Sequence, residues 1–241
     1  MEATRLEVVD DEAALARAAA DVVSGVVAAR PEAVIVPATG ETPLGAYAEL
    51  AARRDAGAFD PSGLTIVQLD DYLGLDAGDR RSLYGWMRRA LLAPLHIPDE
   101  RVLRLPMGAD ADGVVAFDRE LARRGIDLAI LGIGENGHLG FNEPPASADS
   151  DTRIVDLTPA TIAANARYWG TAADVPTRAI TLGLRQILGA RRIVMLASGA
   201  QKHDIVRRAL EGPVGEDVPA SFLREADAEV TVIVDRAAWD G

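Results

Sequence analysis

The sequence predicts an α/β fold, a single domain with a mostly parallel, Rossmann-like sheet and helices on both faces. Short apolar runs rich in Val, Ile and Leu alternate with longer segments of helical periodicity, a pattern typical of parallel sheets with crossover helices. The apolar runs are nearly continuous, as expected for strands that are buried on both sides. Because we find no repeat, no low-complexity tract and no long linker, we expect residues 1–241 to form one domain.

The predicted elements follow one another in order along the chain. Residues 11–30 are rich in Ala with apolar residues at helical spacing, and Pro43 suits the first turn of a helix over residues 43–56. Further predicted helices cover residues 82–92, 113–124, 159–168 and 201–211. The predicted strands cover residues 33–36, 64–69, 127–131, 192–197 and 229–234.

Composition excludes several classes of protein. The 241 residues are 49% hydrophobic and 26% charged, which is typical of a globular chain. A net charge of −12 disfavours nucleic-acid binding, and no apolar run is long enough to span a membrane. The chain has no cysteine, so disulfides and thiolate metal sites are excluded, and the first residues do not resemble a signal peptide. We expect a cytoplasmic protein without nucleic-acid or membrane partners.

Unusual residues gather where the predicted strands end. In parallel α/β sheets, ligands bind outside the carboxyl ends of the strands. This rule selects the segments 37–42, 70–74, 132–144 and 198–202.

The segment Pro-Ala-Thr-Gly-Glu-Thr-Pro, residues 37–43, joins a predicted strand to a predicted helix. Glycine and small hydroxyl residues at a helix N-terminus can present backbone N–H groups to a phosphate. The alternative is an ordinary strand–helix turn in which Thr42 caps the helix.

Asp70 and Asp71 follow the next predicted strand. A carboxylate at a strand end can act as a general base, and a neighbouring like charge can raise its pKa. A solvated turn that caps the following segment is the alternative.

The segment 132–144 places His138, one of three histidines, among four glycines. Histidine suits proton transfer near neutral pH. Glu143 lies five residues further on, close enough in a compact loop to orient the imidazole, and Asn136 lies nearby. These residues favour an acid–base site, and a structural histidine is the alternative.

Lys202 lies at the predicted start of a helix, where a cation is unfavourable unless an anion binds there. We pair it with Arg167 as candidate anion-binding side chains. A Lys202 that points into solvent is an equal alternative.

Residues 137–144, Gly-His-Leu-Gly-Phe-Asn-Glu-Pro, resemble the signature of the glucosamine-6-phosphate deaminase (glucosamine-6-phosphate isomerase) family, which shares a superfamily with the 6-phosphogluconolactonases. Residues 70–72, Asp-Asp-Tyr, are similar to that family's Asp-Glu-Tyr. The resemblance covers nearly the whole chain, from residues 39–43 to residues 201–202 and beyond. Lactonases usually carry a different continuation after the Gly-His pair.

The resemblance implies a role for each candidate. Asp70 would move a proton between C2 and C1 of the open-chain amino sugar, and His138 would open the pyranose ring. Asn136 and Glu143 would support His138, although some family members have Asp in place of Asn136. The side chains and loop that would hold the sugar phosphate are Thr39, Gly40, Glu41, Thr42, Arg167 and Lys202.

Glu41 departs from the family, in which a glycine is common at this position. Because a carboxylate that faces a phosphate is repelled, we expect the Glu41 side chain to point away, so that only its backbone contributes.

The implied reaction converts glucosamine 6-phosphate and water to fructose 6-phosphate and ammonia in amino-sugar catabolism. It has no redox step, so we expect no cofactor and no metal. A galactosamine-6-phosphate deaminase is an open alternative. A 6-phosphogluconolactonase is disfavoured by residues 141–144 and Asp70, and a non-catalytic sugar-phosphate sensor by the presence of Asp70, His138 and Glu143.

Allosteric members of the family bind a second sugar phosphate where subunits meet. This chain has Arg153 at one matching position, but Val155 stands where a lysine would help, and the chain is short at its C-terminus. These departures imply a non-allosteric enzyme that is a monomer or a small homo-oligomer.

Overall fold

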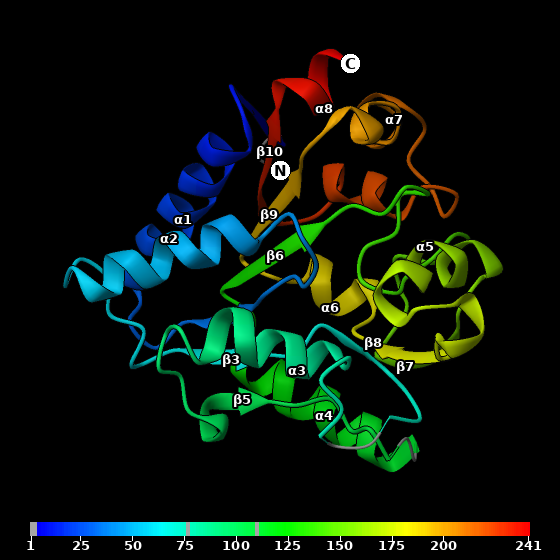
Figure 1. Ribbon diagram of the computed structural model, residues 1–241, viewed down its shortest axis with the longest axis horizontal. Coiled ribbons are helices and arrows are strands. Elements are labelled where there is room, and N and C mark those ends of the chain that lie inside the picture. Colours follow the sequence, from blue (N-terminus) through cyan, green and yellow to red (C-terminus); the bar gives the residue numbers. More distant parts are fainter. Residues whose placement is uncertain (1–3, 76–77, 109–110) are drawn as a thin grey trace.

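The computed structural model describes residues 4–75, 78–108 and 111–241, and its centre is a seven-stranded sheet (Figure 1). Its strand order is β1-β10-β9-β6-β2-β3-β5, and every neighbouring pair is parallel. The strands are β1 (Arg5–Val9), β2 (Val34–Val36), β3 (Thr65–Val67), β5 (Val102–Leu103), β6 (Leu128–Gly132), β9 (Arg192–Ala197) and β10 (Glu229–Asp235).

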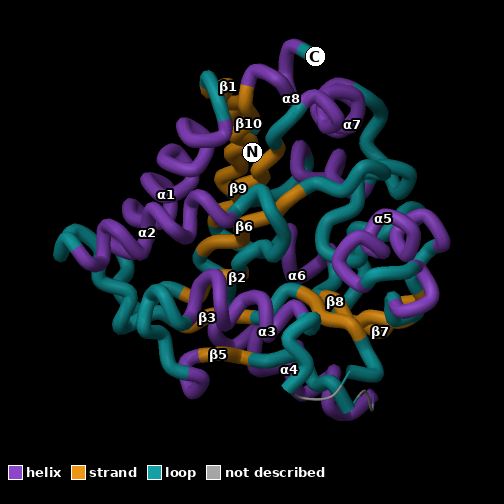
Figure 2. Tube along the Cα trace, viewed as in Figure 1, coloured by secondary structure: helices purple, strands orange, loops and turns teal. Residues whose placement is uncertain are grey.

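Helices cover both faces of this sheet (Figure 2). The helices are α1 (Glu12–Ala29), α2 (Leu44–Asp55), α3 (Leu83–Met87), α4 (Ala111–Arg124), α5 (Pro159–Trp169), α6 (Leu184–Leu188), α7 (His203–Glu211) and α8 (Arg236–Asp240). A π-helical turn at Arg88–Leu92 extends α3, and 3₁₀ turns lie at Asp99–Arg101, Ala172–Asp174, Ala200–Lys202 and Pro219–Arg224.

The sheet separates two apolar cores. Successive side chains of a strand point to opposite faces, so Val194 and Leu196 of β9 pack with α1, α2 and α3. Ile193 and Met195 of the same strand pack with α4, α6 and α7 on the other face. This double burial is the physical reason for the continuous apolar runs in the sequence.

A second, smaller sheet lies beside the first. It is antiparallel, with the strand order β4-β8-β7, and consists of β4 (Asp70–Tyr72), β8 (Arg178–Thr181) and β7 (Arg153–Asp156). Figure 1 shows it next to α5, away from α1 and α2. The expectation that residues 70–74 form a loop is therefore wrong for Asp70–Tyr72, because these residues pair with β8.

The predicted α/β class, the mostly parallel sheet and the helices on both faces are confirmed, and all five predicted strands lie in the large sheet. The predicted helix over residues 201–211 begins as a 3₁₀ turn, and the one over residues 82–92 becomes π-helical. The edge strands β1 and β5 and the whole second sheet were not predicted. No helix in the described parts of the chain is long and apolar enough to cross a membrane.

The strand order changes direction between β2 and β6. From β2 the sheet continues through β3 to β5, and from β6 it continues through β9 and β10 to β1. Loops that leave neighbouring strands in opposite directions open a crevice at the carboxyl ends of those strands. The loop after β2 and the loop after β6 leave the sheet at this switch point, and both carry candidate site residues.

Gly183, between β8 and α6, lies against the backbone of Ser150 and Asp151, just before β7. A substitution at Gly183 therefore tests this close approach. A Cβ at Gly183 would lie 2.0 Å from the Ser150 carbonyl oxygen, which is backbone and cannot move aside cheaply. We expect Gly183→Ala to lower the free energy of unfolding by about 2 kcal/mol or more in urea titrations.

The matched control is Gly25→Ala in the exposed middle of α1, where nothing lies within 4 Å of the added Cβ. That variant should gain roughly 0.5–1 kcal/mol, because Ala favours a helix more than Gly does. A neutral Gly183→Ala variant would contradict the close backbone approach.

Candidate active site

The loop after β6, residues 133–144 and hereafter the His138 loop, folds tightly around the His138 imidazole. The Gly137 N–H donates to the Gly134 carbonyl at 3.0 Å, and the Gly134 N–H donates to the His138 carbonyl at 3.1 Å. A Cβ at Gly134 would lie 2.2 Å from the imidazole. Only glycine leaves room for the ring in this position.

Asn136 fixes the tautomer of His138. The Asn136 Oδ1 lies 2.7 Å from Nδ1 of the imidazole and also accepts the His138 N–H at 3.2 Å, while the Asn136 Nδ2 donates to Glu143 at 3.4 Å. An amide oxygen only accepts hydrogen bonds, so Nδ1 carries the proton and Nε2 has the free lone pair. Burial lowers the pKa of His138, which favours the neutral ring.

Glu143 is held at the start of α5. Its carboxylate accepts hydrogen bonds from the Thr158 N–H at 3.0 Å, from the Thr158 hydroxyl at 2.8 Å and from the Thr161 hydroxyl. Burial by itself raises the pKa of Glu143, but these hydrogen bonds outweigh it and hold the pKa below its ordinary value. Glu143 is therefore a fixed negative charge that orients Asn136.

Asp70 and Asp71 have opposite environments although they are neighbours. Asp71 is buried and accepts the N–H groups of Tyr72, Leu83 and Tyr84 and the amide of Gln68, all at 2.7–3.0 Å. It accepts the first N–H groups of α3, whose N-cap is Ser82, but it does so from a buried strand, so the alternative of a solvated turn is wrong.

Asp70 is 6% exposed, and its Oδ1 has no hydrogen-bond partner in the described residues. Burial, assisted by the charge of Asp71, raises the pKa of Asp70 to about 8. A buried carboxylate without a partner is costly for stability, and such perturbed groups gather at functional sites.

The fold brings Asp70 to the His138 loop. Gly140 has φ +59°, and a Cβ there would lie 3.5 Å from the Asp70 Oδ2. The rings of Tyr72, two residues after Asp70, and Phe141, next to Gly140, have centroids 5.2 Å apart. The base candidate and the imidazole loop are thus packed against each other across the two sheets.

Arg167 lies in the last turn of α5 and faces Glu41. Its guanidinium lies 3.9 Å from the Glu41 carboxylate, stacks over the Tyr168 ring and donates to the Tyr168 hydroxyl at 2.7 Å. The structure corrects the expectation that the Glu41 side chain points away from the phosphate-binding groups. The guanidinium attracts the carboxylate, and both side chains are exposed.

Lys202 points into the protein rather than into solvent. Its Nζ donates to the Ile133 carbonyl of the His138 loop at 2.7 Å. Burial lowers the pKa of Lys202, the charge of Glu135 raises it in part, and the charge of Arg167 lowers it again. Lys202 therefore borders the His138 loop instead of projecting into solvent.

The loop after β2 leaves its polar groups available. Gly40 has φ +98° with open space at its Cβ position. Pro43 rather than Thr42 is the N-cap of α2, and no side chain caps this helix end. The Tyr47 hydroxyl holds the loop by donating to the Ala38 carbonyl at 2.8 Å. The capping alternative for Thr42 is wrong.

Several residues that hold the site were not predicted. Thr158 and Thr161 bind Glu143, while Asn142 and Thr181 bind the backbone around the His138 loop. Thr158 could have been found, because Thr-Pro before a helical segment is an N-cap pattern.

Comparison with known proteins places this geometry in a family. Residues 10–232 match the family of glucosamine-6-phosphate isomerases and 6-phosphogluconolactonases, and the chain belongs to that family. It is 42% identical to a glucosamine-6-phosphate deaminase of Rhodopirellula baltica, over 97% of this chain and 94% of that one. It is 37% identical to a glucosamine-6-phosphate deaminase of Clostridium botulinum, over 97% of each chain.

Solved structures agree with this assignment. A monomeric glucosamine-6-phosphate deaminase superimposes with a TM-score of 0.93 at 34% identity and 98% coverage of both chains. The 6-phosphogluconolactonase of Trypanosoma cruzi superimposes with a TM-score of 0.78 at 20% identity, covering 98% of this chain and 95% of that one. The latter likeness is one of fold.

The burial of Asp70 predicts a pH-dependent gain of stability in Asp70→Asn. The ordinary pKa of 3.8 rises to about 8 in the fold, so the stability contributed by protonated Asp70 is complete below pH 3.8 and is lost as the pH rises through 8. An Asn cannot ionise, so the variant should unfold at higher urea than the parent at pH 9 and at similar urea at pH 4.

Asp71→Asn is the matched control. An Asn amide has a single acceptor oxygen for the N–H donors that surround Asp71, so we expect this variant to be less stable at both pH values. An Asp70→Asn variant without any gain at pH 9 would show that the Asp70 carboxylate is solvated.

Proposed function

We propose that this protein converts glucosamine 6-phosphate and water to fructose 6-phosphate and ammonia. The observation that carries the proposal is the buried, unpartnered Asp70 carboxylate, packed against a loop that holds a neutral histidine. A proton moved between adjacent carbons needs such a base, and the deaminases that the chain resembles over 97% of its length act on an amino sugar.

The phosphate of the substrate lies, in this proposal, between the loop after β2 and the two cations. Thr39 and Thr42 have no side-chain hydrogen bonds within the described residues, and the first turn of α2 has no side-chain cap. Free N–H groups at a helix N-terminus attract an anion, and Arg167 and Lys202 supply positive charge. Anchoring the phosphate turns binding energy into orientation of C1 and C2.

His138 opens the sugar ring. Because Nδ1 donates to Asn136, Nε2 is the atom that takes the proton from the C1 hydroxyl and returns it to the ring oxygen. Glu143 acts through Asn136 and stabilises the imidazolium that forms between these two transfers. The neutral amide keeps the imidazole basic without a carboxylate in direct contact.

Asp70 moves the proton from C2 to C1. The open-chain aldehyde acidifies the C2 proton, and its removal by Asp70, with a proton passing from the C2 ammonium to O1, gives an enolamine. The enolamine receives the Asp70 proton at C1 to give a protonated ketimine. Water adds at C2 and ammonia leaves, so fructose 6-phosphate remains. An ammonium on C2 of the bound substrate lowers the pKa of Asp70, so binding itself favours the carboxylate form.

Ammonia release from purified protein tests the proposal. We expect ammonia and an equal amount of fructose 6-phosphate from glucosamine 6-phosphate, with galactosamine 6-phosphate and 6-phosphogluconolactone as competing substrates in parallel assays. Asp70→Asn keeps the shape of the site and should lower kcat by a factor of about 10³ or more while substrate still binds. Near-normal turnover in Asp70→Asn would remove Asp70 from the mechanism, and ammonia from galactosamine 6-phosphate alone would change the substrate.

Glu41 should weaken the binding of a sugar phosphate. Its carboxylate competes with the phosphate for Arg167 and repels it, so we expect Glu41→Gln to lower KM by about two- to fivefold while kcat changes little. The difference should shrink in high salt.

Glu32→Gln, an equal charge change in the turn before β2 at the other end of the sheet, is the control and should leave KM unchanged. A Glu41→Gln variant with a raised KM would show that the carboxylate helps to hold Arg167 in its binding position.

The cytoplasmic location and the monomeric or small oligomeric state remain predictions from the sequence. Sedimentation of the purified chain tests the oligomeric state directly.

A further inference from the structure

The small antiparallel sheet places three side chains in one row. Asp70 of β4 lies directly opposite Thr181 of β8, and Thr181 lies directly opposite Arg153 of β7. Residues that face each other across antiparallel strands carry their side chains on the same face of the sheet. Asp70, Thr181 and Arg153, hereafter the cross-strand row, therefore all face the same way.

The cross-strand row meets three successive residues of the His138 loop. A Cβ at Gly140 would lie 3.5 Å from the Asp70 carboxylate and 2.9 Å from the Thr181 hydroxyl. The next residue, Phe141, donates its N–H to the Thr181 Oγ1 at 3.2 Å. The residue after it, Asn142, accepts a hydrogen bond from the Arg153 guanidinium at 2.7 Å. Successive residues of the loop thus contact successive members of the cross-strand row.

Thr181 is the centre of this match. It is fully buried, and its hydroxyl donates to the Leu182 carbonyl at 3.1 Å while its oxygen accepts the Phe141 N–H. A hydroxyl has one hydrogen, and Thr181 directs it toward Leu182. Thr181 therefore holds the loop beside Asp70 without giving the Asp70 carboxylate a hydrogen bond, which would weaken it as a base.

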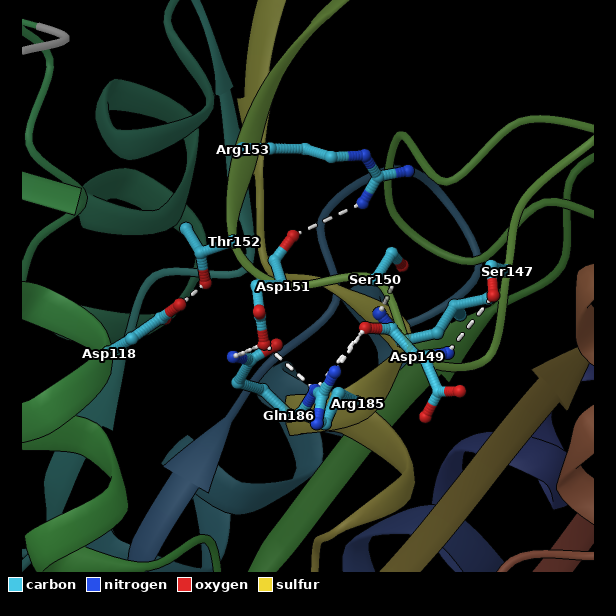
Figure 3. A network of polar contacts seen from close by, with 10 residues as sticks. Asp118, Ser147, Asp149, Ser150, Asp151, Thr152, Arg153, Arg185 and Gln186 are labelled. Atoms are coloured by element: carbon cyan, nitrogen blue, oxygen red, sulfur yellow. Dashed lines mark hydrogen bonds and ion pairs between the residues drawn. The ribbon is translucent and has the colours of Figure 1, made fainter. Parts of the chain in front are cut away.

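The far end of the row is anchored independently. Asn142 is fully buried and donates to the carbonyls of Leu139 at 2.9 Å and Leu182 at 2.8 Å. Figure 3 shows the network that fixes the chain just before β7, where the Arg185 side chain contacts the Asp149 carbonyl at 2.8 Å and the Asp151 carboxylate at 2.9 Å. Arg153 thus projects from a fixed strand end.

We propose that Thr181 is a positioning residue that sets the place of the His138 loop relative to Asp70, with Arg153 holding the same loop through Asn142. This inference rests on the proposed function, since it concerns the two groups that move protons there. Ring opening by His138 and proton transfer by Asp70 act on the same sugar, so the distance between loop and base must suit C1 and C2 together. A misplacement on the order of 1 Å can cost a hundredfold in rate.

Thr181→Val tests this directly. Valine keeps the shape of threonine, removes the acceptor and leaves the Phe141 N–H buried without a partner. We expect kcat on glucosamine 6-phosphate to fall about ten- to hundredfold with KM within about twofold, and Thr181→Ser to recover most of the loss. The same substitution at Thr231, buried in β10 of the large sheet, is the control and should leave kcat within about twofold of the parent value.

Backbone hydrogen exchange at Phe141, measured without substrate, separates this inference from the proposed function. We expect exchange at the Phe141 amide to be about tenfold faster or more in Thr181→Val and unchanged in Thr181→Ser. If the parent protein releases no ammonia, the proposed function fails, while this measurement still decides whether Thr181 holds the loop. Unchanged exchange, unchanged kcat or equal losses in the Val and Ser variants would overturn the positioning role.

Arg153→Met tests the other end of the cross-strand row, where Arg153 donates to Asn142. This variant provides a second test if Thr181→Val does not fold. It removes the donor to Asn142 and should lower kcat about three- to tenfold with faster exchange at Asn142. A variant with unchanged kcat and exchange would show that the row does not hold the loop.

Discussion

The burial of Asp70, which has no hydrogen-bond partner in the part of the chain that the structure describes, is the constraint on which the candidate site depends. An unpaired buried carboxylate destabilises the fold, and it persists because its surroundings are fixed by other contacts. Asp71, next in the chain, is fully satisfied by backbone N–H groups, and Tyr72 packs against Phe141 and Trp169 with ring centroids 5.2 Å away. The strand that carries Asp70 is thereby held in place at both of the residues that follow it.

The second constraint is that His138, the proposed acid–base group, has a lowered pKa that favours the neutral ring. His138 is partly buried and contacts the Asn136 amide rather than a carboxylate, while Glu143 in turn accepts a hydrogen bond from Asn136. Asn136 thus transmits orientation from Glu143, whose charge raises the pKa of His138 while burial lowers it more. The same carboxylate binds Thr158 and Thr161, so the N-terminus of α5 and the imidazole are positioned by a single group, and α5 carries Arg167 at its other end.

The sequence predicts best the strands whose two faces are both buried. Strands such as β9 and β10 are apolar at nearly every position because both faces are covered, and their pattern is unambiguous. The strands β4 and β7 contain Asp70, Asp71 and Arg153 in segments of three or four residues, which look like polar loops. Site residues within one loop, such as His138 and Glu143, are visible as a motif. Thr181 is not, because its partners Phe141 and Asp70 are distant in the chain and a single threonine carries no local pattern.

The most direct test of this account is a titration of the Asp70 carboxyl carbon by NMR in the protein without substrate, with Asp70→Asn assigning the signal. We expect an apparent pKa of about 8, far above the ordinary value of 3.8, because the carboxylate is buried beside Asp71. A sugar phosphate that carries an ammonium at C2 should lower this pKa on binding. An Asp70 that titrates near 4 in the free protein would contradict the buried, unpartnered base from which the rest of the mechanism is derived.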